Sequence, residues 1–502
     1  MITSEKTMMA LANGSDVRGV AVDGVAGEPV TLSAEAANRI ASGFLDFLAG
    51  RTGKKKSELR IAVGHDSRIS AGALKKAIFS ALTYAGCVAV DCSLASTPAM
   101  FMATVFPETK MDGTIMITAS HLPFNRNGMK FFTKEGGVEH ADIEAILKAA
   151  VRVPEFAGDL GKVQRYNLME RYCHHLRKKI RQGIGIGETP LKGMHIVVDA
   201  GNGAGGFFAT QVLGRLGADT SGSVFLEPDG HFPNHIPNPE NHQAMAAIKK
   251  AVLDARADLG LIFDTDVDRM GAVLKNGKEI SRNALIAMMA AILAPENHGS
   301  TIVTDSVTSD ELTVFLERKL ALKHLRFKRG YKNVIDECIR LNAAGTKSPL
   351  AIETSGHGAL SENYFLDDGA YLAVKLLIAA RKQKEKGKGL AELVKDLGEP
   401  AEASEYRLKI KDEDFKTYGK NVLEAFQVRA AEQGIKAADP NYEGVRLIFP
   451  DGWALLRMSL HDPVMPLNVE SRKAGGTAEI VKQLEGFLKD FDKLDLSALK
   501  KK

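Results

Sequence analysis

The sequence predicts an α/β protein with three similar α/β segments and a smaller C-terminal α+β segment. Three stretches each place a short apolar, β-rich run before a Gly- or Asp-containing loop and then a helical pattern, the order of stacked βα units. In the last segment, YRLKI and GVRLIFPDGWALLRMSL predict strands with a hairpin at PDG, and AEIVKQLEGFLKDF predicts a closing helix. A chain of 502 residues is too long for one core, so we expect four domains, at residues 1–165, 166–298, 299–400 and 401–502.

Each of the first three segments ends a predicted strand in a polar loop. The first contains LRIAVGHDSR, a helical ALKKAIFSALTYAG, CVAVDC and GTIMITAS. The second contains MHIVVDAGNGAGG, a helix through QVLGRLG and LGLIFDTDVDRMG, and the third contains STIVTDSVTSDELTVFLERKL and SPLAIETSGHGAL. Ligands of open α/β sheets bind outside the carboxyl ends of the strands. The loops TASH, DTDVD and ETSGH are therefore candidate walls of one cleft.

Composition and charge favour a soluble cytoplasmic protein. A net charge of +4 over 502 residues gives no reason to expect a nucleic-acid or membrane partner. The four cysteines lack metal-type spacing and indicate a reducing compartment. The N-terminus shows no signal-peptide pattern, and the apolar run ALIAMMAAILA is shorter than the roughly 18 residues of a membrane span. The sequence leaves the oligomeric state open.

The sharpest chemical signal is DTDVD, which places Asp264, Asp266 and Asp268 directly after the apolar run LGLIF. In an extended strand end alternate residues share a face, so three carboxylates can converge on one cation. The loop lacks the Gly and Glu that a calcium EF-hand requires, because Arg269 and Lys275 hold those positions. Oxygen ligands of this kind favour Mg²⁺ over Zn²⁺.

A glycine-rich turn supports a competing hypothesis. Gly201, Gly203 and Gly206 match GxGxxG after the strand-like HIVV, and Glu227 follows about twenty residues later, as in a dinucleotide site. The same pattern also arises from tight packing between a strand and a helix. A nicotinamide enzyme would leave the three aspartates and the TASH loop without a role.

Two further motifs offer polar groups. ETSGH supplies Glu353, Ser355 and His357 at a strand end, and sugar hydroxyls need such hydrogen-bond partners. Near the N-terminus, GSDVRG places Arg18 between glycines, and arginine binds phosphate through two parallel hydrogen bonds.

In this order, GSDVRG, GHDSR, TASH, DTDVDR, ETSGH and a C-terminal RMS loop resemble the α-D-phosphohexomutase superfamily, which includes phosphoglucomutase, phosphomannomutase and phosphoglucosamine mutase. The resemblance covers nearly the whole chain and extends to PDGHFPNHIPNPE, upstream of the aspartate loop. It implies three α/β domains with mixed sheets and a smaller fourth domain around a central cleft. It also implies a Mg²⁺ enzyme that interconverts hexose 1-phosphate and 6-phosphate through a phosphoserine, with a hexose 1,6-bisphosphate as intermediate and activator.

The resemblance assigns roles to individual positions. Ser120 matches the phosphoserine, and it joins Asp264, Asp266 and Asp268 as a metal ligand through its phosphate. Lys130 matches a lysine that moves the proton of the attacking hydroxyl. Ser120 needs a sharp turn that exposes it, and Gly128 lets the backbone approach closely.

The remaining positions implied by the resemblance bind the sugar phosphate. The catalytic set also includes Arg18, Arg269 and His357, the last as a second acid/base, and the substrate-binding set comprises Glu353, Ser355, Arg457, Ser459 and His461. ETSGH is closer to the loop of phosphomannomutase/phosphoglucomutase enzymes than to that of dedicated phosphoglucomutases, which favours glucose or mannose phosphates.

Departures from the family pattern keep alternatives open. Leu122 replaces the Asn of TASHNP, and RMSLHDP replaces RxSGTEP or RxSNTEP, so that Leu460 and His461 displace a small residue and a threonine. The alternatives are a phosphoglucosamine mutase and a family member that binds sugar phosphate without efficient turnover.

Overall fold

The computed structural model describes residues 4–155, 161–185, 187–459 and 462–500. The chain forms two compact units, one holding residues 1–285 and 355–392 and the other holding 286–354 and 393–502. The expected α/β class with mixed sheets is confirmed. The four domain boundaries expected from the sequence stay predictions.

The first sheet of the first unit is mixed and has the order β1-β2-β6-β5-β3-β4-β8, with β7 paired to β6. Its strands are β1 (Ala12–Asn13), β2 (Asp16–Val20), β3 (Arg60–His65), β4 (Val88–Leu94), β5 (Gly113–Ile117), β6 (Arg126–Thr133), β7 (Gly136–Gly137) and β8 (Gln164–Arg165). Its helices are α1 (Glu5–Met9), α2 (Ala34–Thr52), α3 (Ala71–Tyr84), α4 (Thr97–Val105) and α5 (His140–Arg152). Because β3, β4 and β5 run parallel, the loops after them lie at one edge of the sheet.

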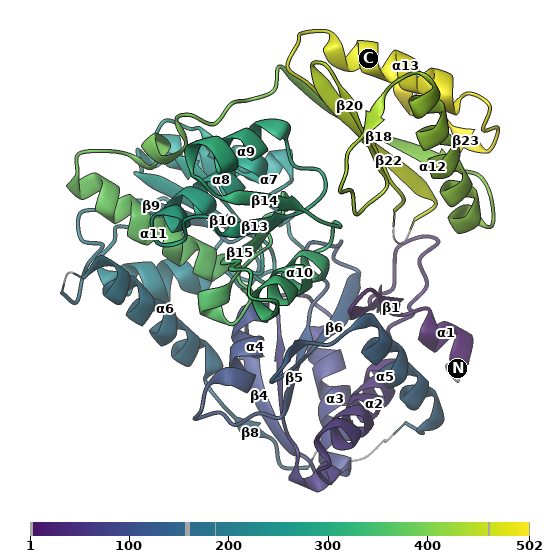
Figure 1. Ribbon diagram of the computed structural model, residues 1–502. Helices are drawn as coiled ribbons and strands as arrows, with labels where there is room; N and C mark the ends of the chain where they lie inside the picture. Colours follow the sequence, from purple (N-terminus) through teal and green to yellow (C-terminus); the bar gives the residue numbers. More distant parts are fainter. Residues whose placement is uncertain (1–3, 156–160, 186, 460–461, 501–502) are drawn as a thin grey trace. The chain divides into compact units, whose positions relative to one another are not determined.

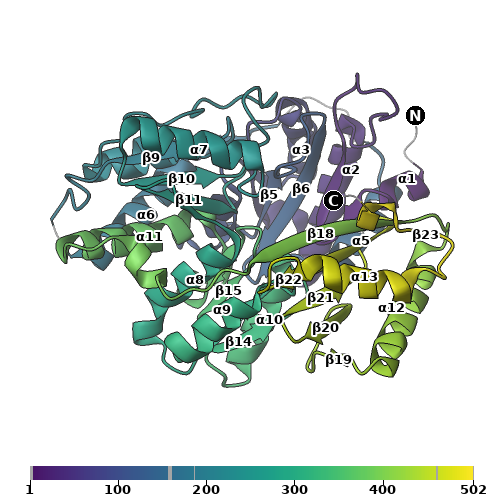
Figure 2. The same cartoon turned by 90° about the horizontal axis from the view of Figure 1, so that it is seen from above.

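Apolar side chains of α2, α3 and α5 share one core with β3 and β5, including Phe44, Ile78, Ile146 and Ile115. Figures 1 and 2 show these helices beside the strands of this sheet. Helix α2 begins where the Ser33 side chain accepts the Ala36 N–H and ends at a left-handed Gly53, so both termini are capped.

The second sheet of the first unit has the order β12-β11-β10-β9. Its strands are β9 (Ile196–Asp199), β10 (Leu259–Phe263), β11 (Met270–Leu274) and β12 (Glu279–Ile280), and its helices include α6 (Leu168–Ile184) and α7 (His242–Ala255). The predicted helix through QVLGRLG is a π-turn over Phe208–Leu213 and a 3₁₀ turn over Gly214–Leu216. The hairpin of β16 (Gly358–Leu360) and β17 (Leu366–Asp367) and helix α11 (Gly369–Glu385) complete this unit, and α8 (Arg282–Leu293) follows β12.

In the second unit, β13 (Thr301–Thr304) lies between β14 (Lys323–Arg326) and β15 (Leu350–Ile352), and all three run parallel. Helices α9 (Asp310–Val314) and α10 (Tyr331–Ala343) connect them. The polar loops after β13 and β14 therefore share an edge.

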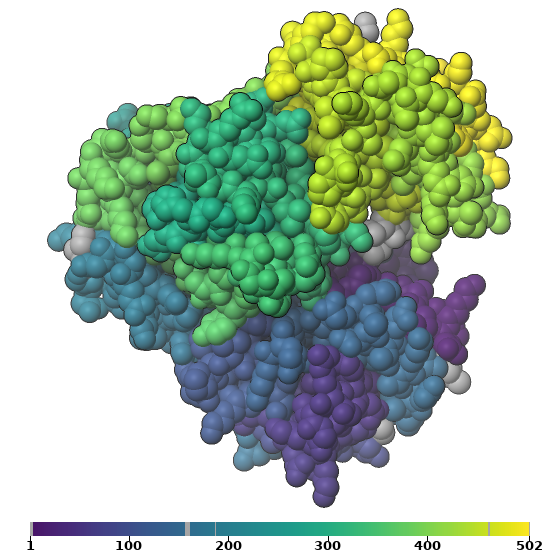
Figure 3. All heavy atoms as spheres, in the orientation of Figure 1, coloured from purple at the N-terminus to yellow at the C-terminus, as the bar shows by residue number. Residues whose placement is uncertain are grey.

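The last segment is the α+β part that the sequence predicts. Its sheet has the order β19-β20-β21-β22-β18-β23. The elements are β18 (Glu402–Ile410), α12 (Phe415–Glu432), β19 (Lys436–Ala437), β20 (Val445–Phe449), β21 (Gly452–Leu456), β22 (Val464–Ser471), α13 (Gly476–Leu488) and β23 (Leu494–Asp495). Helices α12 and α13 pack on one core with the sheet through Phe426 and Leu484, and in the space-filling view this segment is one contiguous body (Figure 3). The hairpin predicted at PDG joins β20 to β21.

Among the described residues, none of the helices has the length and apolar character needed to cross a membrane.

Candidate active site

Ser120 lies in the loop after β5, on a left-handed turn with φ of +50°. Non-glycine residues adopt this conformation uncommonly, and functional loops concentrate it. The Ser120 Oγ donates to Asp264 Oδ2 at 2.9 Å and lies 3.3 Å from His121 Nδ1. The predicted sharp turn is present, but the expected exposure is wrong. Ser120 is only 1% exposed because the acidic loop and its own neighbours enclose it.

A buried arginine holds the Ser120 loop in place. Arg68 donates to four backbone carbonyls of that loop, those of Ser120 at 2.5 Å, Leu122 at 2.6 Å, and Pro123 and Arg126 at 2.8 Å each. Its charge is paired with Asp66, whose Oδ2 is 3.4 Å from Arg68 Nε. Both residues belong to GHDSR, a motif to which the sequence alone assigns no role. A charged pair directly after a buried strand was the available signal.

Asp264, Asp266 and Asp268 gather after β10, and all three are fully buried. One carboxylate oxygen from each lies within 4.8 Å of the others, a spacing that suits a single cation. Asp266 Oδ1 and Asp268 Oδ1 are buried without a hydrogen-bond partner. The three carboxylates converge as expected, but the backbone conformation that brings them together differs from the predicted one. The strand ends at Phe263 and the loop turns through Val267 at φ of +68°, so the expected extended strand end is wrong.

The three carboxylates repel one another. Burial together with Asp268 and Asp266 raises the pKa of Asp264 well above its usual value, and burial together with Asp268 raises the pKa of Asp266 to about 6. Burial also opposes ionisation of Asp268, but the charges of neighbouring cations, Lys130 first, outweigh it and hold its pKa well below the usual range. A divalent cation would relieve this repulsion, and its preferred ligands are the oxygens present.

Lys130 lies on β6 and points its ammonium group at the acidic loop. Its Nζ is 3.2 Å from Asp268 Oδ2 and 3.6 Å from Asp16 Oδ2, and the side chain is buried. Gly128, two residues earlier, lies so close to its neighbours that an added Cβ would be 2.4 Å from Val17 O. The close backbone approach expected of Gly128 is therefore confirmed.

Two arginines border the Ser120 loop. Arg18 on β2 donates through Nη1 to Ala119 O at 3.2 Å and through Nη2 to Asp16 Oδ2 at 3.0 Å. The Arg269 backbone N–H donates to Asp264 Oδ1 at 3.2 Å, and the guanidinium Nε lies 3.8 Å from Asp264 Oδ2. Both arginines therefore bring positive charge to the surroundings of Ser120.

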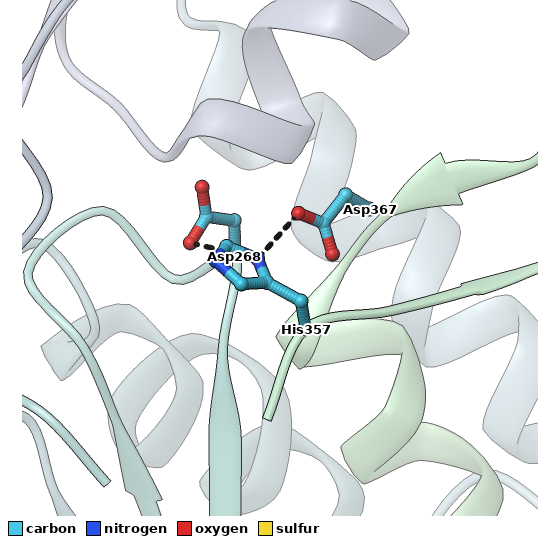
Figure 4. Close-up of side chains that lie close together, drawn as sticks. All are labelled: Asp268, His357 and Asp367. Atoms are coloured by element: carbon cyan, nitrogen blue, oxygen red, sulfur yellow. Dashed lines mark hydrogen bonds and ion pairs between the residues drawn. The ribbon is translucent and has the colours of Figure 1, made fainter. Parts of the chain in front are cut away.

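His357 lies between two carboxylates (Figure 4). Its Nδ1 is 2.5 Å from Asp367 Oδ2 and 3.6 Å from Asp268 Oδ1, and its Nε2 accepts from Arg269 Nε at 2.7 Å. Burial, then the charge of Asp268, raises the pKa of Asp367 well above its usual value, whereas the charge of Lys130 and the Gly358 N–H favour its carboxylate form. Asp367 has no signal of its own in the sequence, because only the β16–β17 hairpin brings LDDG back to ETSGH.

His121, next to Ser120, is kept neutral by its surroundings. Burial and the charges of Arg269 and Arg18 lower the pKa of His121 to about 2. At neutral pH its Nδ1 therefore faces Ser120 Oγ without bringing a charge. His121 belongs to TASH, a motif in which the sequence predicts chemistry only for the serine.

The remaining predicted residues belong mainly to the second unit. Glu353 is buried after β15, and its Oε1 accepts the Gly330 N–H at 2.5 Å. Arg457 lies at the end of β21 with Nη1 3.9 Å from Glu443 Oε1. Ser459 Oγ accepts the Asp462 N–H at 3.3 Å. His461 lies outside the described residues, and Ser355 is buried at the start of the 355–392 segment of the first unit.

The glycines of DAGNGAGG serve packing. A Cβ at Gly203 would lie 2.6 Å from Thr265 O, and one at Gly206 would lie 2.3 Å from Leu226 O. The turn therefore packs against the backbone of the aspartate loop at Thr265 and against the backbone at Leu226.

Comparison with known proteins decides the family. Models of phosphoglucomutase/phosphomannomutase α/β/α domains I, II and III match residues 10–156, 170–277 and 281–400. A phosphomannomutase/phosphoglucomutase from Pseudomonas putida is 30% identical over 458 residues, which cover 90% of this chain and 91% of the relative. The chain belongs to the phosphoglucomutase/phosphomannomutase family. It is accordingly an enzyme of the isomerase class, and the nicotinamide hypothesis is not supported.

Solved structures of the phosphoglucomutase/phosphomannomutase family agree. A family protein from Burkholderia thailandensis has a TM-score of 0.78 at 25% identity, covering 96% of this chain and 98% of that one. A more distant fold relative, the N-acetylphosphoglucosamine mutase of Aspergillus fumigatus solved in complex with GlcNAc-6P and magnesium, has a TM-score of 0.52 at 13% identity and covers 86% of this chain and 82% of that one.

Proposed function

We propose that this member of the phosphoglucomutase/phosphomannomutase family interconverts hexose 1-phosphate and hexose 6-phosphate through a phosphoserine at Ser120. The observation that carries the proposal is the 2.9 Å hydrogen bond from Ser120 Oγ to Asp264, inside a buried cluster of three carboxylates. A serine hydroxyl in that position can accept and return a phosphoryl group, because positioning and charge neutralisation supply most of the catalysis of phosphoryl transfer.

Asp264, Asp266 and Asp268 fit a Mg²⁺ ion, with a phosphate oxygen on Ser120 as a further ligand. The two buried carboxylate oxygens without hydrogen-bond partners support this assignment, since buried polar atoms are otherwise almost always paired. When bound, Mg²⁺ would neutralise charge on the transferring phosphoryl group.

The protein residues around Ser120 would manage protons and phosphate charge. In the forward step a sugar hydroxyl oxygen bonds to the phosphorus and the bond between phosphorus and Ser120 Oγ breaks. The hydroxyl proton passes to His357, acting as the second acid/base, or to Lys130 in its neutral amine form, and the Ser120 alkoxide takes up a proton from water. Arg18, which donates to Ala119 O, and Arg269, whose Nε lies 3.8 Å from Asp264 Oδ2, would balance the phosphoryl charge. The resulting hexose 1,6-bisphosphate returns its other phosphate to Ser120 and can also act as activator.

Substrate recognition falls to a further set of residues. Glu353 and Ser355 would bind the sugar hydroxyls, and Arg457, Ser459 and His461 would bind the phosphate that does not react. The ETSGH loop and the similarity to a phosphomannomutase/phosphoglucomutase favour glucose or mannose phosphates. Phosphoglucosamine remains the alternative substrate.

A turnover assay tests the proposal. Glucose 1-phosphate or mannose 1-phosphate is supplied with Mg²⁺ and glucose 1,6-bisphosphate, and formation of the 6-phosphate is measured. Ser120→Ala should remove turnover, whereas Ser57→Ala, at an exposed serine, should leave it unchanged. Equal loss or equal retention in the two variants would contradict the assignment.

The substitutions in RMSLHDP favour a second candidate, a sugar-phosphate-binding protein without efficient turnover. Isothermal titration with glucose 6-phosphate separates the two. Saturable binding with no detectable conversion, by protein whose Ser120 carries phosphate, would establish the binding-only function.

A further inference from the structure

We propose that Asp367 is a positioning residue that fixes the imidazole of His357 as the Nδ1–H tautomer, leaving the Nε2 lone pair as its proton-accepting atom. The tautomer follows from contacts within the first unit. Its consequence for catalysis rests on the proposed mutase function.

Arg269 decides which nitrogen of His357 carries the proton. A guanidinium has only donors and stays charged in proteins, so Arg269 Nε can contact His357 Nε2 at 2.7 Å only if that nitrogen accepts. In a neutral imidazole one nitrogen accepts and the other donates. The proton of His357 therefore lies on Nδ1.

Asp367 receives that proton in a fixed geometry. Its Oδ2 lies 2.5 Å from His357 Nδ1, and its Oδ1 accepts the Gly358 N–H at 2.9 Å. Both oxygens are thus used by donors that flank the start of β16. Because Asp367 pairs with Ala359 across the β16–β17 hairpin, the backbone sets the position of the carboxylate relative to the ring.

The metal-loop carboxylate does not hold the ring. Asp268 Oδ1 is 3.6 Å from His357 Nδ1, beyond hydrogen-bond distance. Figure 4 shows the imidazole between the two aspartates. Asp367, on the opposite side from the aspartate loop, is left as the residue that orients it.

The arrangement would give His357 a defined role in the proposed reaction. A sugar hydroxyl that displaces Arg269 Nε from Nε2 meets an acceptor that already has the right tautomer and orientation. Its O–H bond breaks, an Nε2–H bond forms, and the positive charge on the ring faces the Asp367 carboxylate. A carboxylate that holds a histidine in this way preserves both its orientation and its tautomer.

The informative substitution is Asp367→Asn, with Asp368→Asn as its matched control. An asparagine at 367 has one acceptor and one donor, so it cannot accept from both His357 Nδ1–H and Gly358 N–H. If its amide donates to Nδ1, the ring proton moves to Nε2 and opposes Arg269 Nε–H. Asp368 accepts hydrogen bonds from Tyr172, Tyr371 and Asn363 instead. The control therefore makes the same Asp-to-Asn change at a neighbouring buried carboxyl that does not bind His357.

We expect Asp367→Asn to lower kcat by about 100-fold or more while KM for the sugar phosphate changes by less than about threefold, and Asp368→Asn to leave both within about threefold of wild type. A change in KM with kcat unaltered, or an equal loss of kcat in the two variants, would overturn the positioning role.

A second measurement tests the tautomer without activity. With ¹⁵N-labelled histidine, the ring nitrogens of His357 are identified by their loss in His357→Gln, and the wild-type protein should show a protonated Nδ1 and an unprotonated Nε2. A protonated Nε2 overturns the inference even if the enzyme turns over. A protonated Nδ1 in a protein without mutase activity would refute the proposed function and leave the tautomer assignment standing.

Discussion

Three buried aspartates, close enough to bind one cation together, oppose one another's ionisation and so destabilise the empty site. Asp264 and Asp266 have raised pKa values because burial and neighbouring carboxylates oppose their ionisation. Lys130 offsets part of this repulsion through Asp268. Like charges held this close destabilise the protein unless a ligand neutralises them, a pattern that marks functional sites.

Asp266→Asn tests whether the repulsion among the three carboxylates is the cost of binding a cation. The change removes one ligand charge, so turnover at limiting Mg²⁺ should fall by about 100-fold or more. The melting temperature should stay equal or rise, because one buried like charge is gone. Asp254→Asn, which alters an exposed i,i+4 pair with Lys250, is the control. Unchanged activity at limiting Mg²⁺ would refute the metal assignment.

Arg68→Met probes the residue that holds the Ser120 loop. Removing the guanidinium leaves the buried Asp66 carboxylate unpaired and four loop carbonyls without their donor, so we expect a loss of about 3–5 kcal/mol of unfolding free energy. Arg51→Met breaks an exposed pair with Asp142 and should cost about 1 kcal/mol or less. Urea denaturation of both variants makes the comparison, and similar small losses would show that Arg68 does not clamp the loop.

Among individual residues, those that belong to a short contiguous motif could be predicted from the sequence. Ser120, Lys130 and the three aspartates are of this kind, and the structure brings them together. Residues that act through tertiary contacts could not be predicted in this way. Arg68 reaches carbonyls more than fifty positions away, and Asp367 meets His357 only across a hairpin. Neither contact has a local signature.

At the scale of single elements, helix α11 begins on an ionisable cap. Asp368 Oδ1 accepts the Tyr371 N–H at 2.8 Å and the Tyr172 hydroxyl at 2.7 Å. Burial raises the pKa of Asp368 to about 7, despite these donors. A carboxyl whose folded pKa exceeds its unfolded value stabilises the fold most when protonated, and this contribution is lost as the pH rises toward the folded pKa.

Asp368→Asn should therefore flatten the dependence of stability on pH. Between pH 5 and pH 8 wild type should lose roughly 2.5 kcal/mol of unfolding free energy relative to the variant, from a shift between 3.8 and about 7. The asparagine oxygen can still accept from Tyr371 and Tyr172, so the cap is kept. Denaturation curves at the two pH values measure the difference, and parallel losses in both proteins would contradict the raised pKa.

Element prediction succeeded where the apolar pattern was regular. GTIMI is β5 and LGLIF is β10, each with its polar loop beginning at the next residue or two. It failed where close packing reshaped the backbone. QVLGRLG forms π and 3₁₀ turns, and DTDVD bends through Val267 while its three carboxylates come close together.

At the scale of the whole molecule, turnover requires binding of the phosphate that does not react, and Arg457 of the second unit is the proposed ligand. Arg457→Lys keeps the charge but loses the planar fork, so KM for the sugar phosphate should rise about tenfold with kcat little changed. Arg472→Lys, in an exposed pair with Glu311, is the control. Steady-state kinetics decide, and an unchanged KM would remove Arg457 from the substrate site.

Ser120 is the proposed carrier of the phosphoryl group, and peptide mass spectrometry after incubation with Mg²⁺ and glucose 1,6-bisphosphate detects that phosphate. We expect phosphate on the peptide containing Ser120 and on no other, lost on addition of hexose monophosphate and absent in Ser120→Ala. Folded protein that remains unphosphorylated at Ser120, or that is phosphorylated elsewhere with the same kinetics, would refute this role of Ser120.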